Sequence, residues 1–191
     1  LEIAKTWIDK TGLETITSKP IVMYRECIRS SAGPFESRSP NRHNRLRIAV
    51  EPLENEIVDK IRKGEIHDGI DKKNLARTLR EYGWETEEAR GVWTVDERCN
   101  IFTDITKGVQ RLDQIKGSIT IGFVDAMEEG PLAGEPVRGV KVKLMDAAVH
   151  EDPVHFGPGQ IIPATRFGIF AAMLSANPAL LEPLLKIDVK L

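Results

Sequence analysis

The basic stretch Ser37–Arg47 carries the side chains best suited to bind a nucleic acid. It reads SRSPNRHNRLR and contains Arg38, Arg42, Arg45 and Arg47 without any acidic residue. Guanidinium groups donate paired hydrogen bonds to phosphates, while Asn and Ser side chains bond sugars or base edges. The stretch therefore predicts a phosphate-binding loop. The alternative is a solvated loop whose arginines pair with acidic residues elsewhere in the chain.

A second candidate is the segment His150–Gln160, which reads HEDPVHFGPGQ. His155 stands shortly before Gly-Pro-Gly, where the chain must turn and few side chains crowd the imidazole. Asp152 could accept a hydrogen bond from that imidazole. Two other interpretations stay open: an exposed histidine without a role, and a metal site formed by His150, Asp152 and His155. Pro153 interrupts the helical face that would align those three ligands.

The motifs of several enzyme classes are missing from the sequence. It contains no G-x-x-x-x-G-K-[ST] phosphate loop, no G-x-G-x-x-G before a helix and no Ser or Cys nucleophile elbow. We expect His67 and the acidic run Glu81–Glu88 to be solvated. Cys27 and Cys99 stand far apart, which argues against a disulfide framework or a zinc site and suits a reducing compartment. Spacing alone therefore predicts no catalytic site.

Size and charge describe a globular chain whose binding surface must be local. The 191 residues are 41% hydrophobic and 29% charged, which is typical of a folded protein. The net charge of −2 gives no reason to expect nucleic-acid binding by the chain as a whole. We expect no membrane span and no signal peptide. Leu1 falls within an apparent helix, so we also expect a piece of a longer protein.

Apolar periodicity predicts a mixture of helices and strands that would position these two segments. Helical spacing is found at residues 1–10, 54–63, 72–82, 109–127 and 163–176, the last with Pro163 in its first turn. Alternation predicts strands at residues 20–27, 46–50, 92–97, 100–105, 139–149 and 184–191. Residues 29–44 are rich in Ser, Gly, Pro and Asn and predict a long loop. Interspersed helices and strands indicate a two-layer α/β (α+β) domain.

Long motifs along nearly the whole chain resemble one family, the archaeal type of translation elongation factor 2. The similar segments are SKPIVMYRE (residues 18–26), SPNRHN (39–44), NIFTDITKGVQRLDQIK (100–116), GPLAGEPVRGVKVKLMDA (130–147) and HEDPVHFGPGQIIPATR (150–166). They occur in the order found in that family. A related GTPase that has lost translocation would be expected to lack the loop that contains Asp152, His155 and Gly157.

The resemblance implies a domain organisation. Residues 1–26 would close the third domain, residues 27–180 would form most of the fourth, and residues 181–191 would open the fifth. The fourth domain of the family has a ribosomal-protein-like fold with a βαβ unit, here lacking its C-terminal helix. The GTPase domain of the family, which binds GTP and magnesium, would lie outside this chain. The chain itself would then be no enzyme and would hold no cofactor and no metal.

The resemblance also implies a function and partners. The family promotes GTP-dependent translocation of tRNA and mRNA in the cytoplasm, and the tip of its fourth domain enters the ribosomal decoding site. His155 matches the histidine that is converted to diphthamide, so modifying enzymes and ADP-ribosylating toxins become expected partners, with no membrane involved. Phe156 departs from the Arg usual in the family, and we expect it to be exposed and able to stack on a base. The residues expected to contact RNA are Arg38, Ser39, Pro40, Asn41, Arg42, His43, Asn44, Arg45, Asp152, Phe156, Gly157 and Gln160.

The competing interpretation is a metal-dependent hydrolase. It would use His150, Asp152 and His155 as ligands, and stoichiometric zinc or manganese in purified protein would favour it.

Overall fold

The computed structural model describes residues 6–8, 10–12 and 22–184, which belong to two separate units. In the smaller unit, residues 6–8 and 10 are helical, and the Thr11 hydroxyl donates to the Ile8 carbonyl at 2.7 Å. The helix predicted for residues 1–10 therefore lies partly outside the described residues, and the strand predicted for residues 184–191 lies almost wholly outside them. The larger unit, Tyr24–Glu182, contains both candidate loops.

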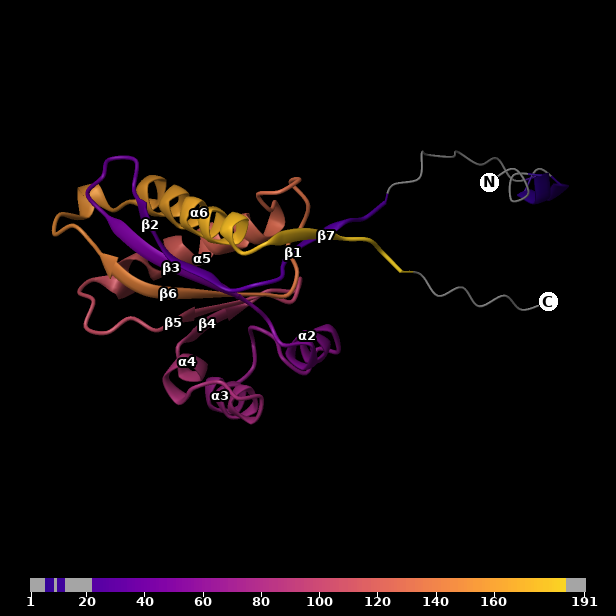
Figure 1. Ribbon diagram of the computed structural model, residues 1–191, viewed down its shortest axis with the longest axis horizontal. Helices are drawn as coiled ribbons and strands as arrows, with labels where there is room; N and C mark the ends of the chain where they lie inside the picture. Colours follow the sequence, from indigo (N-terminus) through magenta and orange to yellow (C-terminus); the bar gives the residue numbers. More distant parts are fainter. Residues whose placement is uncertain (1–5, 9, 13–21, 185–191) are drawn as a thin grey trace. The chain divides into compact units, whose positions relative to one another are not determined.

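A five-stranded sheet forms the centre of the larger unit (Figure 1). Its strands are β2 (Ala32–Arg38), β3 (Arg45–Pro52), β4 (Val92–Val95), β5 (Ile101–Asp104) and β6 (Val140–Ala148), in the order β2-β3-β6-β5-β4. Only β5 and β6 pair in parallel, and the helix α5 (Leu112–Glu128) connects them. This is the predicted βαβ unit, and the predicted mixed α/β class is confirmed.

Two long helices, α5 and α6 (Pro158–Ser175), cover one face of the sheet (Figure 1). Leu46, Ile48 and Val50 alternate along β3 toward this face and are fully buried. They join Phe102 and Phe123 in the larger of two hydrophobic cores. Helix α6 begins at Pro158, so the prediction of Pro163 in its first turn is wrong. Pro158 takes that place because its fixed φ and missing N–H suit the start of a helix.

Three shorter helices pack beside β4 and β5 over a second core. They are α2 (Asn55–Arg62), α3 (Lys72–Glu81) and α4 (Thr86–Arg90), and the core includes Ile57, Leu79 and Ile101. Helices α2 and α3 confirm the periodicity, whereas α4 was not predicted. The expectation that Glu81–Glu88 is solvated is wrong for Trp84, which is buried in the second core, and for Glu88, whose carboxylate lies 3.0 Å from the ammonium group of buried Lys141. Among the described residues, no helix is long and apolar enough to cross a membrane.

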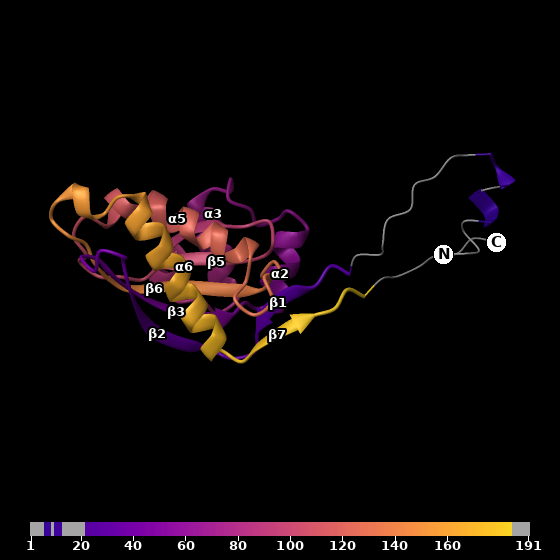
Figure 2. The same cartoon turned by 90° about the horizontal axis from the view of Figure 1, so that it is seen from above.

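A separate pair of strands closes the end of the unit opposite the candidate loops (Figure 2). Strand β1 (Arg25–Ile28) pairs antiparallel with β7 (Pro178–Leu181). The strand predicted for residues 20–27 is thus confirmed at residues 25–27 and not found at residues 22–24, while residues 20–21 lie outside the described residues. The strand β7 was not predicted. Glu26 in β1 is fully buried, and its carboxylate accepts hydrogen bonds from the backbone N–H groups of Leu132, Ala133 and Glu135.

The long loop predicted for residues 29–44 is wrong in its middle part, because β2 occupies Ala32–Arg38. β2 is an edge strand that is largely exposed, so its sequence AGPFESR lacks the apolar alternation of a half-buried strand. Its Ser37 is buried and donates a 2.6 Å hydrogen bond to the Ala164 carbonyl of α6. The true loop is the short turn Ser39–Asn44.

Candidate nucleic-acid interface

The first loop, Ser39–Asn44, is a tight turn between β2 and β3. The Ser39 N–H donates to the Asn44 carbonyl at 3.0 Å, and the Arg42 N–H donates to the Ser39 carbonyl at 2.7 Å. Arg42 has φ 62°, a left-handed conformation that non-glycine residues rarely adopt. The turn places Arg42 and His43 at its exposed end.

The second loop, His150–Gly157, connects β6 to α6 and contains a 3₁₀ turn at Pro153–His155. The Asp152 carboxylate caps this turn by accepting from the Val154 N–H at 3.0 Å. The Asp152 N–H in turn donates to Nδ1 of His150 at 3.0 Å. Asp152 is therefore used to shape the loop, and the predicted hydrogen bond to the His155 imidazole is not made.

Hydrogen bonds join the two loops directly. Nδ2 of Asn41 and Nδ2 of Asn44 both donate to the His155 carbonyl, at 2.8 and 2.7 Å. The His150 N–H donates to Oδ1 of Asn44 at 3.0 Å, and the Asn41 N–H donates to Oε1 of Gln160 at 2.9 Å. Segments more than a hundred residues apart thus form one tip.

The imidazoles of His43, His150 and His155 gather at this tip. Their ring centroids are 4.5 Å apart for His43–His155, 4.5 Å for His150–His155 and 5.0 Å for His43–His150. Throughout residues 6–8, 10–12 and 22–184, no group of three or more His, Cys, Asp or Glu side chains could hold a metal ion. Asp152 and Nδ1 of His150 are already engaged with backbone N–H groups. This geometry does not favour the metal-dependent hydrolase.

Exposure divides the predicted site residues into three groups. Arg38, Pro40, Arg42, His43 and Asp152 are exposed, and Asn41, Arg45, His155, Gly157 and Gln160 are half-buried. Ser39 and Asn44 are 1% exposed and Phe156 is 8% exposed, so their side chains face inward. The expectation of an exposed, base-stacking Phe156 is wrong, because this side chain belongs to the main core. Sequence reasoning also missed Val154, which is 82% exposed on the second loop.

The arginines of the basic stretch differ in their partners. Arg38 pairs with Glu36 at 2.9 Å, and Arg45 lies 3.3 Å from Asp146. For these two, the alternative of pairing with nearby acids applies. Arg42 forms no ion pair within the described part of the chain, so its guanidinium is available to an external phosphate.

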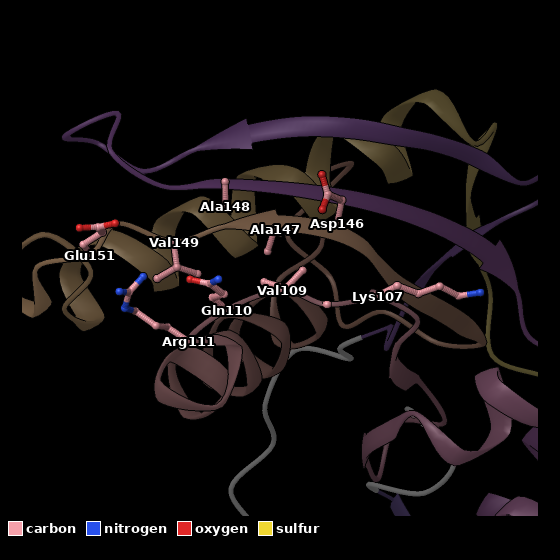
Figure 3. Close-up of a pocket in the computed structure, with 10 residues that line it drawn as sticks. Lys107, Val109, Gln110, Arg111, Asp146, Ala147, Ala148, Val149 and Glu151 are labelled. Carbon is pink, nitrogen blue, oxygen red and sulfur yellow. The ribbon is translucent and has the colours of Figure 1, made fainter.

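A cavity of about 340 Å³ lies beside the second loop and was not predicted (Figure 3). It is lined by residues 107–111 before α5, by residues 146–149 at the end of β6, and by Glu151. Lys107 lies at one end of the cavity, and Arg111 and Glu151 lie at the other (Figure 3). Acidic and basic side chains are mixed in its lining, so its charge does not select one class of ligand.

Comparison with known proteins confirms the family resemblance. A family model described as elongation factor G, domain IV matches residues 68–177. Elongation factor 2 of Staphylothermus marinus is 53% identical over 192 residues, covering the whole of this chain and 26% of that protein. The elongation factor 2 proteins of Aeropyrum pernix and Sulfolobus acidocaldarius are each 51% identical, over 100% and 94% of this chain and 26% and 25% of their own lengths. The chain thus spans about a quarter of the length of these curated relatives. It therefore belongs to the elongation factor G domain IV family, within which these relatives are archaeal elongation factor 2 proteins.

Proposed function

We propose that this chain is the part of an elongation factor 2 that enters the ribosomal decoding site during translocation of tRNA and mRNA. The observation that carries the proposal is the single tip made by two distant loops, with Arg42 exposed and unpaired beside the three imidazoles. A local cationic group on a chain of net charge −2 favours approach to RNA through the tip alone.

On this proposal the chain carries out no bond chemistry of its own. The tip occupies the site that the moving tRNA vacates and holds the codon–anticodon pair in frame. Small-subunit ribosomal RNA, mRNA and tRNA are its partners in the cytoplasm. GTP and magnesium bind to a part of the factor outside this chain, and GTP hydrolysis there makes entry of the tip directional.

His155 is the proposed site of diphthamide modification. His155 is half-buried, its imidazole lies beside those of His43 and His150, and its carbonyl is fixed by two amide donors. Diphthamide would add reach and a fixed positive charge to this position, both of which favour contact with a phosphate backbone. Diphthamide-synthesis enzymes and ADP-ribosylating toxins are then partners of the same tip.

The proposed domain boundaries follow from the family. Residues 1–26 would end the third domain, residues 27–180 would form the fourth without its C-terminal helix, and residues 181–191 would begin the fifth. The compactness of Tyr24–Glu182 as one unit supports a boundary near each of its ends.

Replacing Arg42 with Ala in the full-length factor tests the proposal. Loss of one phosphate contact should slow translocation, raise frameshifting and reduce the slope of log ribosome affinity against log salt by about 1. GTP binding should be unchanged. Arg77→Ala is the matched control, because Arg77 is exposed on α3, away from the tip. Unchanged rate, frame and salt slope in Arg42→Ala would refute the decoding-site assignment.

A further inference from the structure

The main-chain carbonyl of His155 accepts two side-chain amide donors at once. Nδ2 of Asn41 lies 2.8 Å from this oxygen and Nδ2 of Asn44 lies 2.7 Å from it. A carbonyl oxygen has two lone pairs, so both of its acceptor positions are occupied. Both donors come from the first loop, whereas the acceptor is in the second. The peptide that follows His155 is therefore fixed by side chains remote in sequence.

Asn44 holds both ends of the segment 150–155. Its Oδ1 accepts from the His150 N–H at 3.0 Å, while its Nδ2 donates to the His155 carbonyl. Asn44 is itself fixed, because its N–H donates to Oγ of Ser39 at 3.0 Å and its carbonyl accepts from the Ser39 N–H. With 1% exposure, its side chain is shielded from solvent and from any RNA.

We infer that Asn44, supported by Asn41, is a positioning residue for the His155 imidazole and not a contact for RNA. Fixing the backbone at residues 150 and 155 fixes the direction of each Cα–Cβ bond. The His155 ring is thereby held 4.5 Å from the rings of both His43 and His150. The functional importance of this placement rests on the proposed function, whereas the placement itself can be tested without it.

Asn44→Asp separates the two halves of the interaction. The variant keeps the size of the side chain and the oxygen that accepts from the His150 N–H. It replaces the donor to His155 with a second oxygen, which repels the carbonyl. Asn44→Ala removes both halves. Asn74→Asp on α3 is the matched control, because Asn74 is exposed and bonds only locally, to Arg77 and Asp71.

Nuclear magnetic resonance on this chain gives the direct readout. In Asn44→Asp, cross-relaxation between the His43 and His155 rings should be lost, while the His150 amide stays slow to exchange. Asn44→Ala should lose both signals, and Asn74→Asp should lose neither. Methyl signals of the main core report that each variant is folded. If Asn44→Ala does not fold, Asn41→Asp replaces it, since Asn41 is half-buried and supplies the other donor. A retained ring contact in folded Asn44→Asp and Asn41→Asp would overturn the inference.

Modification of His155 gives a second readout, in the full-length factor produced by an archaeal host that makes diphthamide. A displaced imidazole should lower the modified fraction of the His155 peptide in Asn44→Asp by at least about tenfold, since small misplacements slow group transfer strongly. Full modification in a variant that has lost the ring contact would overturn the positioning role. If the ring contact depends on Asn44 but Arg42→Ala leaves translocation intact, positioning stands and the decoding proposal fails.

Discussion

Phe156 anchors the second loop in the main core, directly beside half-buried His155. Its side chain is 8% exposed and packs in the cluster that contains Leu46 and Ile161. The loop therefore has one inward-facing aromatic ring between two residues that face the tip or solvent, His155 and Gly157. The Arg that the family resemblance implied at this position would have to direct its charge elsewhere, because an unpaired buried charge is costly.

Phe156→Ala should lower the free energy of unfolding by about 3 kcal/mol, because it leaves a cavity under the loop. Urea denaturation followed by tryptophan fluorescence measures this change. Val154→Ala is the control on the same loop, and its effect should stay within about 0.5 kcal/mol because Val154 is 82% exposed. Equal effects of the two substitutions would contradict the anchoring role.

For single residues, the sequence predicts which segments form the tip more reliably than it predicts the role of each residue within them. Composition alone singled out the basic stretch and the histidine before Gly-Pro-Gly, and both lie at the tip. It could not separate exposed Arg42 from buried Asn44, because the burial of Asn44 depends on partners 106 and 111 positions away. Such partners are known only once the chain has folded.

Close packing of α5 on α6 depends on Gly122. A Cβ atom added there would lie 2.8 Å from the Ile162 carbonyl oxygen and 2.8 Å from Cβ of Thr165. The exposed Gly117 of the same helix has no such neighbour within 4 Å. The two glycines of α5 therefore have opposite roles, one permitting helix contact and one only weakening the helix.

Alanine at these two positions should shift stability in opposite directions. Gly117→Ala should raise the free energy of unfolding by roughly 0.5–1 kcal/mol, because Ala loses less backbone entropy in a helix. Gly122→Ala should lower it by about 1–3 kcal/mol through overpacking. Thermal unfolding of both variants checks the pair, and stabilisation by Gly122→Ala would show that the helices can separate without penalty.

Element prediction succeeded where one face of an element is buried and failed at the two strands without a buried face, β2 and β7. The helices α2 and α3 and the strand β6 follow their apolar periodicity closely, and Asp71 caps α3 by accepting from the Asn74 N–H. The strand β2 was missed because it is largely exposed and contains Gly, Pro and Ser, and β7 was missed because its four residues, PALL, include none that is buried and are too few to show an alternation. Their pairing depends on partners outside the local sequence.

Across the whole molecule, an ion cluster joins the sheet to the helices of the second core. The ammonium group of Lys141 in β6 lies 2.9 Å from Glu51 of β3, 3.0 Å from Glu88 of α4 and 4.3 Å from the centre of the Trp84 ring. Lys143 pairs with the other oxygen of Glu51.

Burial pushes the pKa of Glu51 upward, but hydrogen bonds from Lys143 and Lys141 outweigh this effect and leave that pKa below its ordinary 4.5. Burial likewise lowers the pKa of Lys141, yet Glu51 and Glu88 raise it overall above its ordinary 10.5.

Lys141→Met should lower the free energy of unfolding at neutral pH by about 3 kcal/mol, because Glu88 and Glu51 lose their buried partner. A lowered carboxyl pKa stabilises the fold above the ordinary value and ceases to do so as the pH falls through the folded pKa. The deficit of Lys141→Met relative to the unaltered chain should therefore shrink below about pH 4.5. In the unaltered chain, the contribution of Lys141 should be lost as the pH rises through its raised pKa, above 10.5. Urea titrations at several pH values measure both limits, and a deficit independent of pH would exclude the ion cluster as its source.

Because β1 pairs antiparallel with β7, the chain enters and leaves the larger unit through one two-stranded ribbon. Arg25 is opposite Leu181, so the polypeptide comes in and goes out at neighbouring points, far from the tip (Figure 2). Units with adjoining termini tolerate transplantation into a host protein. A small rotation of the unit about these two strands would therefore produce a large displacement of the three histidines at the opposite end.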